Sequence, residues 1–151
     1  MALELPDRAK VLNFVVRNKN FIRVRMKIKA INTTYAPAAI GPYSQAIEAN
    51  GFVYVSGQLP IDPSTGSFVE GGIQIEARQS LTNIKNILAE AGLGMENVVK
   101  VTVLLADINN FAAVNDVYAE SFQAPYPARS AFAVAALPKG ANIEIEAIAS
   151  R

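Results

Sequence analysis

The strongest constraint on the fold lies near the C-terminus, where two runs with strand character flank a short turn. The runs cover residues 130–136 and 143–149, and the turn at residues 137–140 contains a proline followed two positions later by a glycine. Gly and Pro mark turns, and apolar alternation over such lengths is typical of strands. The pattern predicts that both runs belong to one sheet.

Charged side chains border these two runs. Arg129 immediately precedes the first run, and Glu144 and Glu146 lie within the second. If the runs pair or lie close in the sheet, the three side chains come from neighbouring strands near a common edge. A cation and carboxylates brought together at strand ends make a plausible site for a small anion.

Upstream, the chain carries signals for a strand, a shaped loop and a hairpin. A strand pattern covers residues 26–31, and residues 35–45 contain two prolines and a glycine that disfavour helix. The dipeptide Asn50-Gly51 between two short strand runs predicts a type I′ hairpin. Residues 57–66 are expected to form a loop that leads into a helix.

The clearest helical pattern covers residues 72–91. Apolar residues recur there at helical spacing, and Gly92 can take the left-handed conformation that ends a helix. These apolar residues are Ala77, Leu81, Ile84, Leu88 and Ala91. Residues 98–106 then predict a strand in which Val101, Val103 and Leu105 share one face.

A second, shorter helix is expected after this strand. Its apolar stripe is Phe111, Val114 and Tyr118, and the Pro-rich stretch 123–127 ends it before Arg129. Three residues can cap its N-terminus: Asp107, Asn109 or Asn110.

The order of these elements predicts an α+β fold with two helices on one face of a sheet. Two helices cover only one face, yet several strands carry apolar or small residues on both. Phe52 and Tyr54 alternate with two valines, and Phe132 alternates with alanines. A sheet face left apolar after helix docking usually meets another subunit, so the sequence predicts an oligomer.

Composition excludes several kinds of chemistry. The chain has 151 residues, enough for one domain, and no histidine, cysteine or tryptophan. Imidazole bases, thiolate nucleophiles, disulfides and the usual zinc ligand sets are therefore absent. Any catalysis must use Arg, Lys, carboxylates, hydroxyl groups, amides or the backbone.

The overall charge of +1 hides two unlike segments. Residues 1–29 carry eight basic against two acidic residues, whereas residues 30–151 carry six basic against eleven acidic residues. We divide the chain into a basic extension, residues 1–25, and a domain, residues 26–151. A targeting role for the extension fits its arginine content, but it lacks Ser and Thr. The acidic body disfavours nucleic acid, and no apolar run predicts a membrane span.

Several motifs resemble the RidA (reactive intermediate deaminase) family. The resemblance runs from about residue 26 to residue 151 and leaves the basic extension outside. The motifs are Ala-Pro-Ala-Ala-Ile-Gly-Pro-Tyr43-Ser-Gln, Val-Ser56-Gly57-Gln, Ala-Arg-Gln-Ser-Leu, Phe-Ala-Ala-Val-Asn115, Pro-Ala-Arg129-Ser and Ile-Glu144-Ile-Glu-Ala.

The resemblance implies a chorismate-mutase-like homotrimer with a small-carboxylate site in each of three clefts between subunits. Typical members are cytoplasmic and hydrolyse enamines and imines, such as 2-aminoacrylate and 2-aminocrotonate, to 2-oxo acids and ammonia. They need no cofactor and no metal.

The resemblance also assigns roles to individual residues. Arg129 would clamp the substrate carboxylate, and Glu144 would position water and relay protons, kept ionised by the nearby arginine. The remaining residues would line or support the cleft: Tyr43, Ser56, Gly57, Asn115 and the backbone carbonyl of Ala131. Many members carry cysteine where this chain has Ala131. The connection between Asn115 and Arg129 is also shorter than the resemblance leads one to expect.

Other interpretations of the same residues remain open at this point. Arg129 could be a structural ion-pair partner, and the two glutamates could belong to a solvated strand face. Besides the deaminase, the family includes activities described as ribonuclease or translation inhibitor. A third class is a non-catalytic trimer that binds a small carboxylate.

Overall fold

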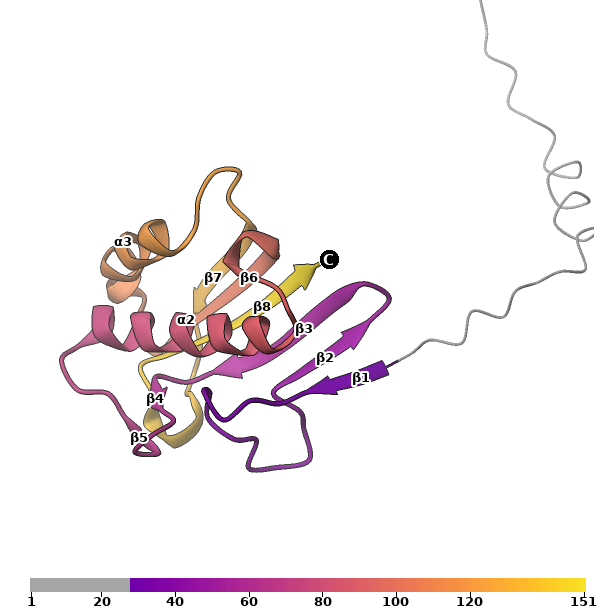
Figure 1. Cartoon of the computed structure of the whole chain (residues 1–151). Helices are drawn as coiled ribbons and strands as arrows, with labels where there is room; N and C mark the ends of the chain where they lie inside the picture. Colours follow the sequence, from indigo (N-terminus) through magenta and orange to yellow (C-terminus); the bar gives the residue numbers. More distant parts are fainter. Residues whose placement is uncertain (1–27) are drawn as a thin grey trace, which may run out of the picture.

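A computed structural model describes residues 28–151, and its centre is one six-stranded mixed sheet (Figure 1). The strand order is β1-β2-β3-β8-β6-β7. All neighbours are antiparallel except β6 and β7, which are parallel. The strands are β1 Ile28–Ile31, β2 Ala46–Ala49, β3 Phe52–Gln58, β6 Val98–Leu105, β7 Ala128–Ala133 and β8 Ile143–Ser150.

Both helices pack on the same face of this sheet, as the sequence predicted (Figure 1). Helix α2 spans Ile73–Glu90, close to the expected 72–91, and Gly92 follows it with a φ of 71°. Helix α3 spans Phe111–Ser121 and is preceded by the one-turn helix η2, Ile108–Asn110, which Asp107 caps. The buried residues of α3 are Val114, Val117 and Tyr118, so the predicted stripe missed Val117 and included the part-exposed Phe111.

The core lies between the helices and the sheet. Val101, Val103 and Leu105 of β6 are buried against the helices, as expected, and Ile143 and Ile145 of β8 are buried beside them. We call this side of the sheet the helix face and the opposite side the open face. In the described chain the open face exposes aromatic rings of three strand residues: Phe52 (40%), Tyr54 (47%) and Phe132 (48%).

The turns confirm one prediction and correct another. Asn50 and Gly51 have φ values of 52° and 80°, as a type I′ hairpin requires. The expected loop 57–66 instead begins inside β3 and continues into a small hairpin. That hairpin is formed by β4, Ile61–Asp62, and β5, Ser67–Phe68. Two further one-turn helices are η1, Met95–Asn97, and η3, Pro138–Gly140.

The strands near the C-terminus are arranged differently from the expectation. β7 and β8 belong to one sheet, but β6 lies between them and pairs with both. The prediction that Arg129 and Glu144 lie on adjacent strands is therefore wrong. The turn at residues 137–140 suggested that the strands on either side of it form a hairpin. Instead, β7 pairs in parallel with β6, to which α3 connects it. The other edge of β7 has no strand partner within the described residues.

Two further predictions concern membrane spans and the basic extension. No helix among residues 28–151 has the length and apolar character of a membrane span. The basic extension, residues 1–25, lies outside the described residues.

Candidate functional site

A cavity of about 760 Å³ opens where β3 and β8 meet the loops that precede β2, follow β3 and precede β8. Four of the predicted site residues line it: Tyr43, Ser56, Gly57 and Glu144. Its wall is otherwise largely apolar and includes Ile40, Leu59, Ile61 and Pro138. Polar groups gathered in an apolar hollow are typical of a small-molecule site.

A β-bulge places the glycine and the glutamate together. Val55 pairs with Ala147 and Gln58 with Ile145, so Ser56 and Gly57 both lie opposite the single residue Glu146. A Cβ on Gly57 would overlap Oε1 of Glu144 and lie 2.7 Å from its carboxyl carbon. The φ of Gly57 lies outside the left-handed region. Close approach of the carboxylate, rather than backbone conformation, is therefore what disfavours a side chain at position 57, because any Cβ there would displace the Glu144 carboxylate.

The loop that carries Tyr43 is held by a buried glutamine. The Gln45 side chain, 2% exposed, accepts a hydrogen bond from the Thr33 N–H at 2.7 Å and donates to the carbonyls of Ala36 and Pro37 at 3.1 and 2.8 Å. It also donates to the Thr33 carbonyl at 3.0 Å. Gln45 was seen in the sequence only as part of a motif, and the satisfied amide explains why it is needed.

Ser56 is fixed to the same loop. Its Oγ donates to the Ser44 carbonyl at 2.7 Å, and its backbone N–H donates to the Gln45 carbonyl at 3.0 Å. Lys139 also lines the cavity, from a left-handed backbone position with a φ of 56°. Lys139 was not predicted for the site, because the sequence of a turn does not indicate which surface its lysine side chain faces.

The electrostatics of Glu144 differ from the expectation. Burial raises the pKa of the Glu144 carboxyl above its usual value, and the neighbouring charge of Glu146 raises it further. The expectation that Arg129 keeps this carboxylate ionised is wrong within one chain, because the arginine lies elsewhere. A carboxyl with a raised pKa suits proton transfer near neutral pH.

Arg129 lies on the helix face, away from this cavity. It is paired in register with the buried Val101, whereas Glu144 is paired with Leu104, and alternate residues of a strand point to opposite faces. The sheet therefore separates the two predicted catalytic side chains. The alternation of residues along β6 indicates which of them face the helices. It could not show that Arg129 and Glu144 lie on opposite faces until the pairing of β6 with β7 and β8 was known.

Side chains of α3 surround the Arg129 guanidinium. Its Nη1 donates to Oδ1 of Asn115 at 3.0 Å, and its Cζ lies 4.4 Å from the ring centroid of Tyr118 and 5.3 Å from that of Phe111. The ion pairs among residues 28–151 are Arg78–Glu120 and Arg151–Glu48, so the interpretation of Arg129 as an ion-pair partner finds no support. Asn115 thus acts on Arg129 rather than on the cavity.

Ala131 lies two residues after Arg129 on β7. In a strand with a parallel neighbour, the N–H and C=O groups of one residue both point to the same side of the strand, and those of the next residue point to the opposite side. Because Val134 donates its N–H to the Leu105 carbonyl, the even-numbered residues of β7 face β6. The carbonyl of Ala131 therefore points to the unpaired edge of β7, where a ligand or another chain can reach it.

The described residues hold two half-sites rather than one site. The first is the cavity with Glu144, and the second is the β7 edge with Arg129 and the Ala131 carbonyl. No group of His, Cys, Asp and Glu side chains in this part of the chain is arranged to hold a metal ion. Together the half-sites offer an arginine cation, a carboxyl group with a raised pKa and a backbone carbonyl.

Fold and half-sites define a small α+β domain with a carboxyl group in a cavity and a cation at a separate sheet edge. The model of the family described as endoribonuclease L-PSP matches residues 33–151. The chain belongs to this family, which includes the RidA proteins, and the resemblance found in the sequence is confirmed.

Relatives of established name cover most of the chain. A goat protein named 2-iminobutanoate/2-iminopropanoate deaminase is 60% identical over 121 residues, which are 80% of this chain and 88% of the relative. The crystal structure of RidA from the Antarctic bacterium Psychrobacter is 46% identical, with a TM-score of 0.79, and the match covers 82% of this chain and 99% of the other. The structure of E. coli TdcF with bound serine is 47% identical, with a TM-score of 0.78, and covers 82% and 98%.

Proposed function

We propose that this protein is a 2-iminobutanoate/2-iminopropanoate deaminase, which hydrolyses reactive imines and enamines to 2-oxo acids and ammonia. The observation that carries the proposal is the Glu144 carboxyl, half-buried against Gly57 in an apolar cavity with a raised pKa. Support also comes from the deaminase names of relatives that are 54–60% identical. The amino-acid ligand of TdcF fits a site that holds a small carboxylate.

The catalytic centre in this proposal is shared between two copies of the chain. One copy supplies the cavity with Tyr43, Ser56 and Glu144, and a neighbour supplies Arg129 and the Ala131 carbonyl from its open β7 edge. A cyclic trimer makes three equivalent centres of this kind. The exposed aromatic rings of the open face supply apolar surface for the contact.

The reaction needs three things from these groups. The planar guanidinium of Arg129 holds the substrate carboxylate with two parallel hydrogen bonds. Glu144 takes a proton from water as its oxygen adds to the C=N carbon, which places a hydroxyl group on that carbon. The carboxyl group delivers this proton to the nitrogen, which gives a carbon that carries one hydroxyl and one amino group. Glu144 then takes the proton of the hydroxyl group and passes it to the nitrogen, so the C–N bond breaks, ammonia leaves and the C=O bond of the 2-oxo acid forms.

The charge distribution favours this function over RNA cleavage. Residues 30–151 carry a net charge of −5 and no histidine, so they offer neither the basic surface nor the imidazole base that such cleavage commonly uses. A non-catalytic carboxylate-binding trimer would use Arg129, but it would not need a carboxyl group whose pKa burial raises.

The first experiment measures the three function classes side by side. The full chain is added to 2-aminoacrylate generated in the assay, and 2-oxo acid formation is compared with spontaneous hydrolysis. A deaminase accelerates 2-oxo acid release, whereas a ribonuclease degrades a labelled RNA control and a binding protein does neither. No acceleration at micromolar protein would overturn the proposal.

A second experiment tests whether the site is shared. Arg129→Ala and Glu144→Gln chains are unfolded together, refolded as a mixture and compared with each variant refolded alone. If every centre takes Glu144 from one chain and Arg129 from another, about a quarter of the centres regain both residues by random assembly. Light scattering should give the mass of a trimer, and a stable monomer would remove the shared centre.

A further inference from the structure

One face of α3 is built around the Arg129 side chain. Phe111, Asn115 and Tyr118 follow one another at spacings of four and three residues, which places them on one side of the helix. The two rings meet the guanidinium at 5.3 and 4.4 Å from its carbon, and Asn115 bonds one of its nitrogens at 3.0 Å. We call these three residues the arginine cradle.

The cradle holds the Arg129 cation with no carboxylate partner among residues 28–151. Ring faces attract a guanidinium through their electron-rich centres and leave the N–H donors at its rim available. Burial raises the pKa of the Tyr118 phenol, and the Arg129 charge lowers it to a lesser degree. Tyr118 therefore stays neutral beside Arg129 and contributes its ring face rather than a negative charge.

The hydroxyl group of Tyr118 contributes no hydrogen bond of its own. It is buried and has no partner within the described residues. A buried hydroxyl group without a hydrogen bond lowers the stability of the fold. The hydroxyl group therefore does not explain why an aromatic ring stands at position 118. Removing the oxygen while keeping the ring therefore separates the two contributions of this residue cleanly.

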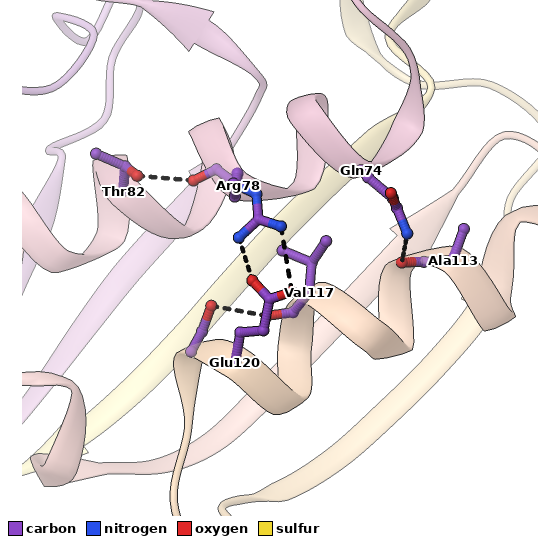
Figure 2. Close-up of polar contacts among 7 residues, drawn as sticks. Gln74, Arg78, Thr82, Ala113, Val117 and Glu120 are labelled. Atoms are coloured by element: carbon purple, nitrogen blue, oxygen red, sulfur yellow. Dashed lines mark hydrogen bonds and ion pairs between the residues drawn. The ribbon is translucent and has the colours of Figure 1, made fainter.

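Polar contacts to α2 hold the helix in place on its other side. Figure 2 shows Arg78 of α2 paired with Glu120, and Gln74 reaching the Ala113 carbonyl. Val117 lies between these contacts and is fully buried. α3 is thus fixed against α2 on one side and presents the cradle to β7 on the other.

We propose that Tyr118 and Phe111 are positioning residues that set the plane of the Arg129 guanidinium for its substrate carboxylate. The inference rests on the proposed function of Arg129 as the clamp. Asn115 fixes the rotation of the guanidinium within that plane, and the remaining N–H donors face outward as a fork. A lysine at position 129 would lack this plane, and leucine in place of either ring would let it tilt.

The test compares Tyr118→Leu and Phe111→Leu with the conservative Tyr118→Phe in the full chain. Each leucine variant should raise KM for 2-iminobutanoate, and Kd for 2-oxobutanoate, by about threefold to thirtyfold, the range of a cation–ring contact. The kcat should change by less than about threefold, because Glu144 is untouched. Tyr118→Phe should keep the KM and Kd of the parent. Phe111→Leu should remain folded, because Phe111 is part-exposed in the parent.

Phe122→Leu is the matched control for loss of a buried ring. Phe122 is buried, its ring centroid lies 4.5 Å from that of Tyr118, and it does not stack on the guanidinium. It should lower the urea midpoint as Tyr118→Leu does and leave KM near the parent value. Equal KM effects from Phe122→Leu and Tyr118→Leu would overturn the inference, as would a loss of binding in Tyr118→Phe.

The failure of the inference is distinguishable from failure of the proposed function. If Arg129→Lys weakens 2-oxobutanoate binding and the leucine variants do not, Arg129 is the clamp and the cradle does not orient it. If Arg129→Lys leaves binding unchanged, the clamp itself is wrong.

Discussion

Glu144 lies in a cavity whose wall touches its carboxylate, whereas Arg129 lies on ring faces that leave most of its donors free. The first arrangement withdraws a carboxyl group from water and raises its pKa. The second orients a cation and gives it no carboxylate among residues 28–151. The first arrangement therefore fits the proton transfer proposed for Glu144, and the second fits the anion binding proposed for Arg129.

The difference explains why neither half is sufficient. A carboxyl group beside another carboxylate repels an anionic substrate, and an arginine by itself cannot relay protons at neutral pH. Each half keeps a charge that folding alone does not neutralise. Charges that lower the stability of the fold in this way are typical of functional sites.

Replacing the proton relay should give the largest effect. Glu144→Gln keeps the shape of the side chain but removes the acid and base, so kcat should fall about 10²-fold or more. Binding of 2-oxobutanoate, measured by calorimetry, should survive. Glu146→Gln is the comparison: it keeps the Glu144 carboxyl and removes only the neighbouring charge that raises its pKa further, so kcat should fall far less than in Glu144→Gln. An active Glu144→Gln would disprove the carboxylate mechanism.

Changing the clamp should affect binding rather than chemistry. Arg129→Lys keeps the charge but loses the planar fork, a loss of roughly 1.5–3 kcal/mol for a charge-assisted hydrogen bond. KM and the Kd of 2-oxobutanoate should rise together by roughly tenfold or more. Arg151→Lys is the matched control, since Arg151 pairs with Glu48 at 2.6 Å. A fall in kcat at constant Kd would reverse the roles assigned to the two halves.

Disturbing the cavity wall should have a smaller effect that is still confined to chemistry. Gly57→Ala places a methyl group where the Glu144 carboxylate lies, so the carboxylate must rotate away. We expect a fall in kcat of about tenfold, in line with misplacement of a reacting group. Gly66→Ala is not a suitable control because its φ is 72°, whereas Gly94→Ala has an ordinary φ and lies outside the cavity. Equal activity of Gly57→Ala and parent would mean that Glu144 needs no fixed position.

The raised pKa of Glu144 predicts a pH-dependent effect on stability. A carboxyl whose folded pKa lies above its unfolded value favours folding fully below the unfolded pKa, and loses that contribution as pH rises through the folded pKa. Glu144→Gln should therefore be more stable than the parent near pH 7, with the difference shrinking as pH falls toward 4. Urea midpoints at several pH values measure this. A parent more stable at neutral pH would contradict the burial of Glu144.

Removing the basic extension should have the smallest effect. Residues 1–25 lie outside the family match, so we expect a chain that starts at Met26 to keep its thermal midpoint and its deaminase rate within about twofold of the parent. A large loss of activity would show that the extension contributes to the site or to assembly.

Local patterns in the sequence predicted most of the elements. Helix α2 and its Gly92 cap, the Asn50-Gly51 hairpin and the alternation of β6 all follow from residues within a few positions of one another. The placement of β6 between β7 and β8 does not, because strand order is decided by packing between distant segments. The Ser56–Gly57 bulge was hidden for the same reason.

The candidate site was predicted residue by residue but not in space. The family resemblance named Arg129 and Glu144, and the turn between their strands suggested that they meet. Their separation depends on which face of β7 meets α3, and the interaction of Arg129 with Tyr118 depends on the same contact. Neither is visible in a linear pattern.

The position of the sheet between Arg129 and Glu144 has a kinetic consequence. When a centre is divided between chains, the concentration of working centres follows the law of mass action for subunit association. Specific activity should then be constant at high protein concentration and fall steeply once dilution takes the protein below its dissociation constant. The unpaired edge of β7 would thereby make the rate per chain a measure of how crowded the chains are.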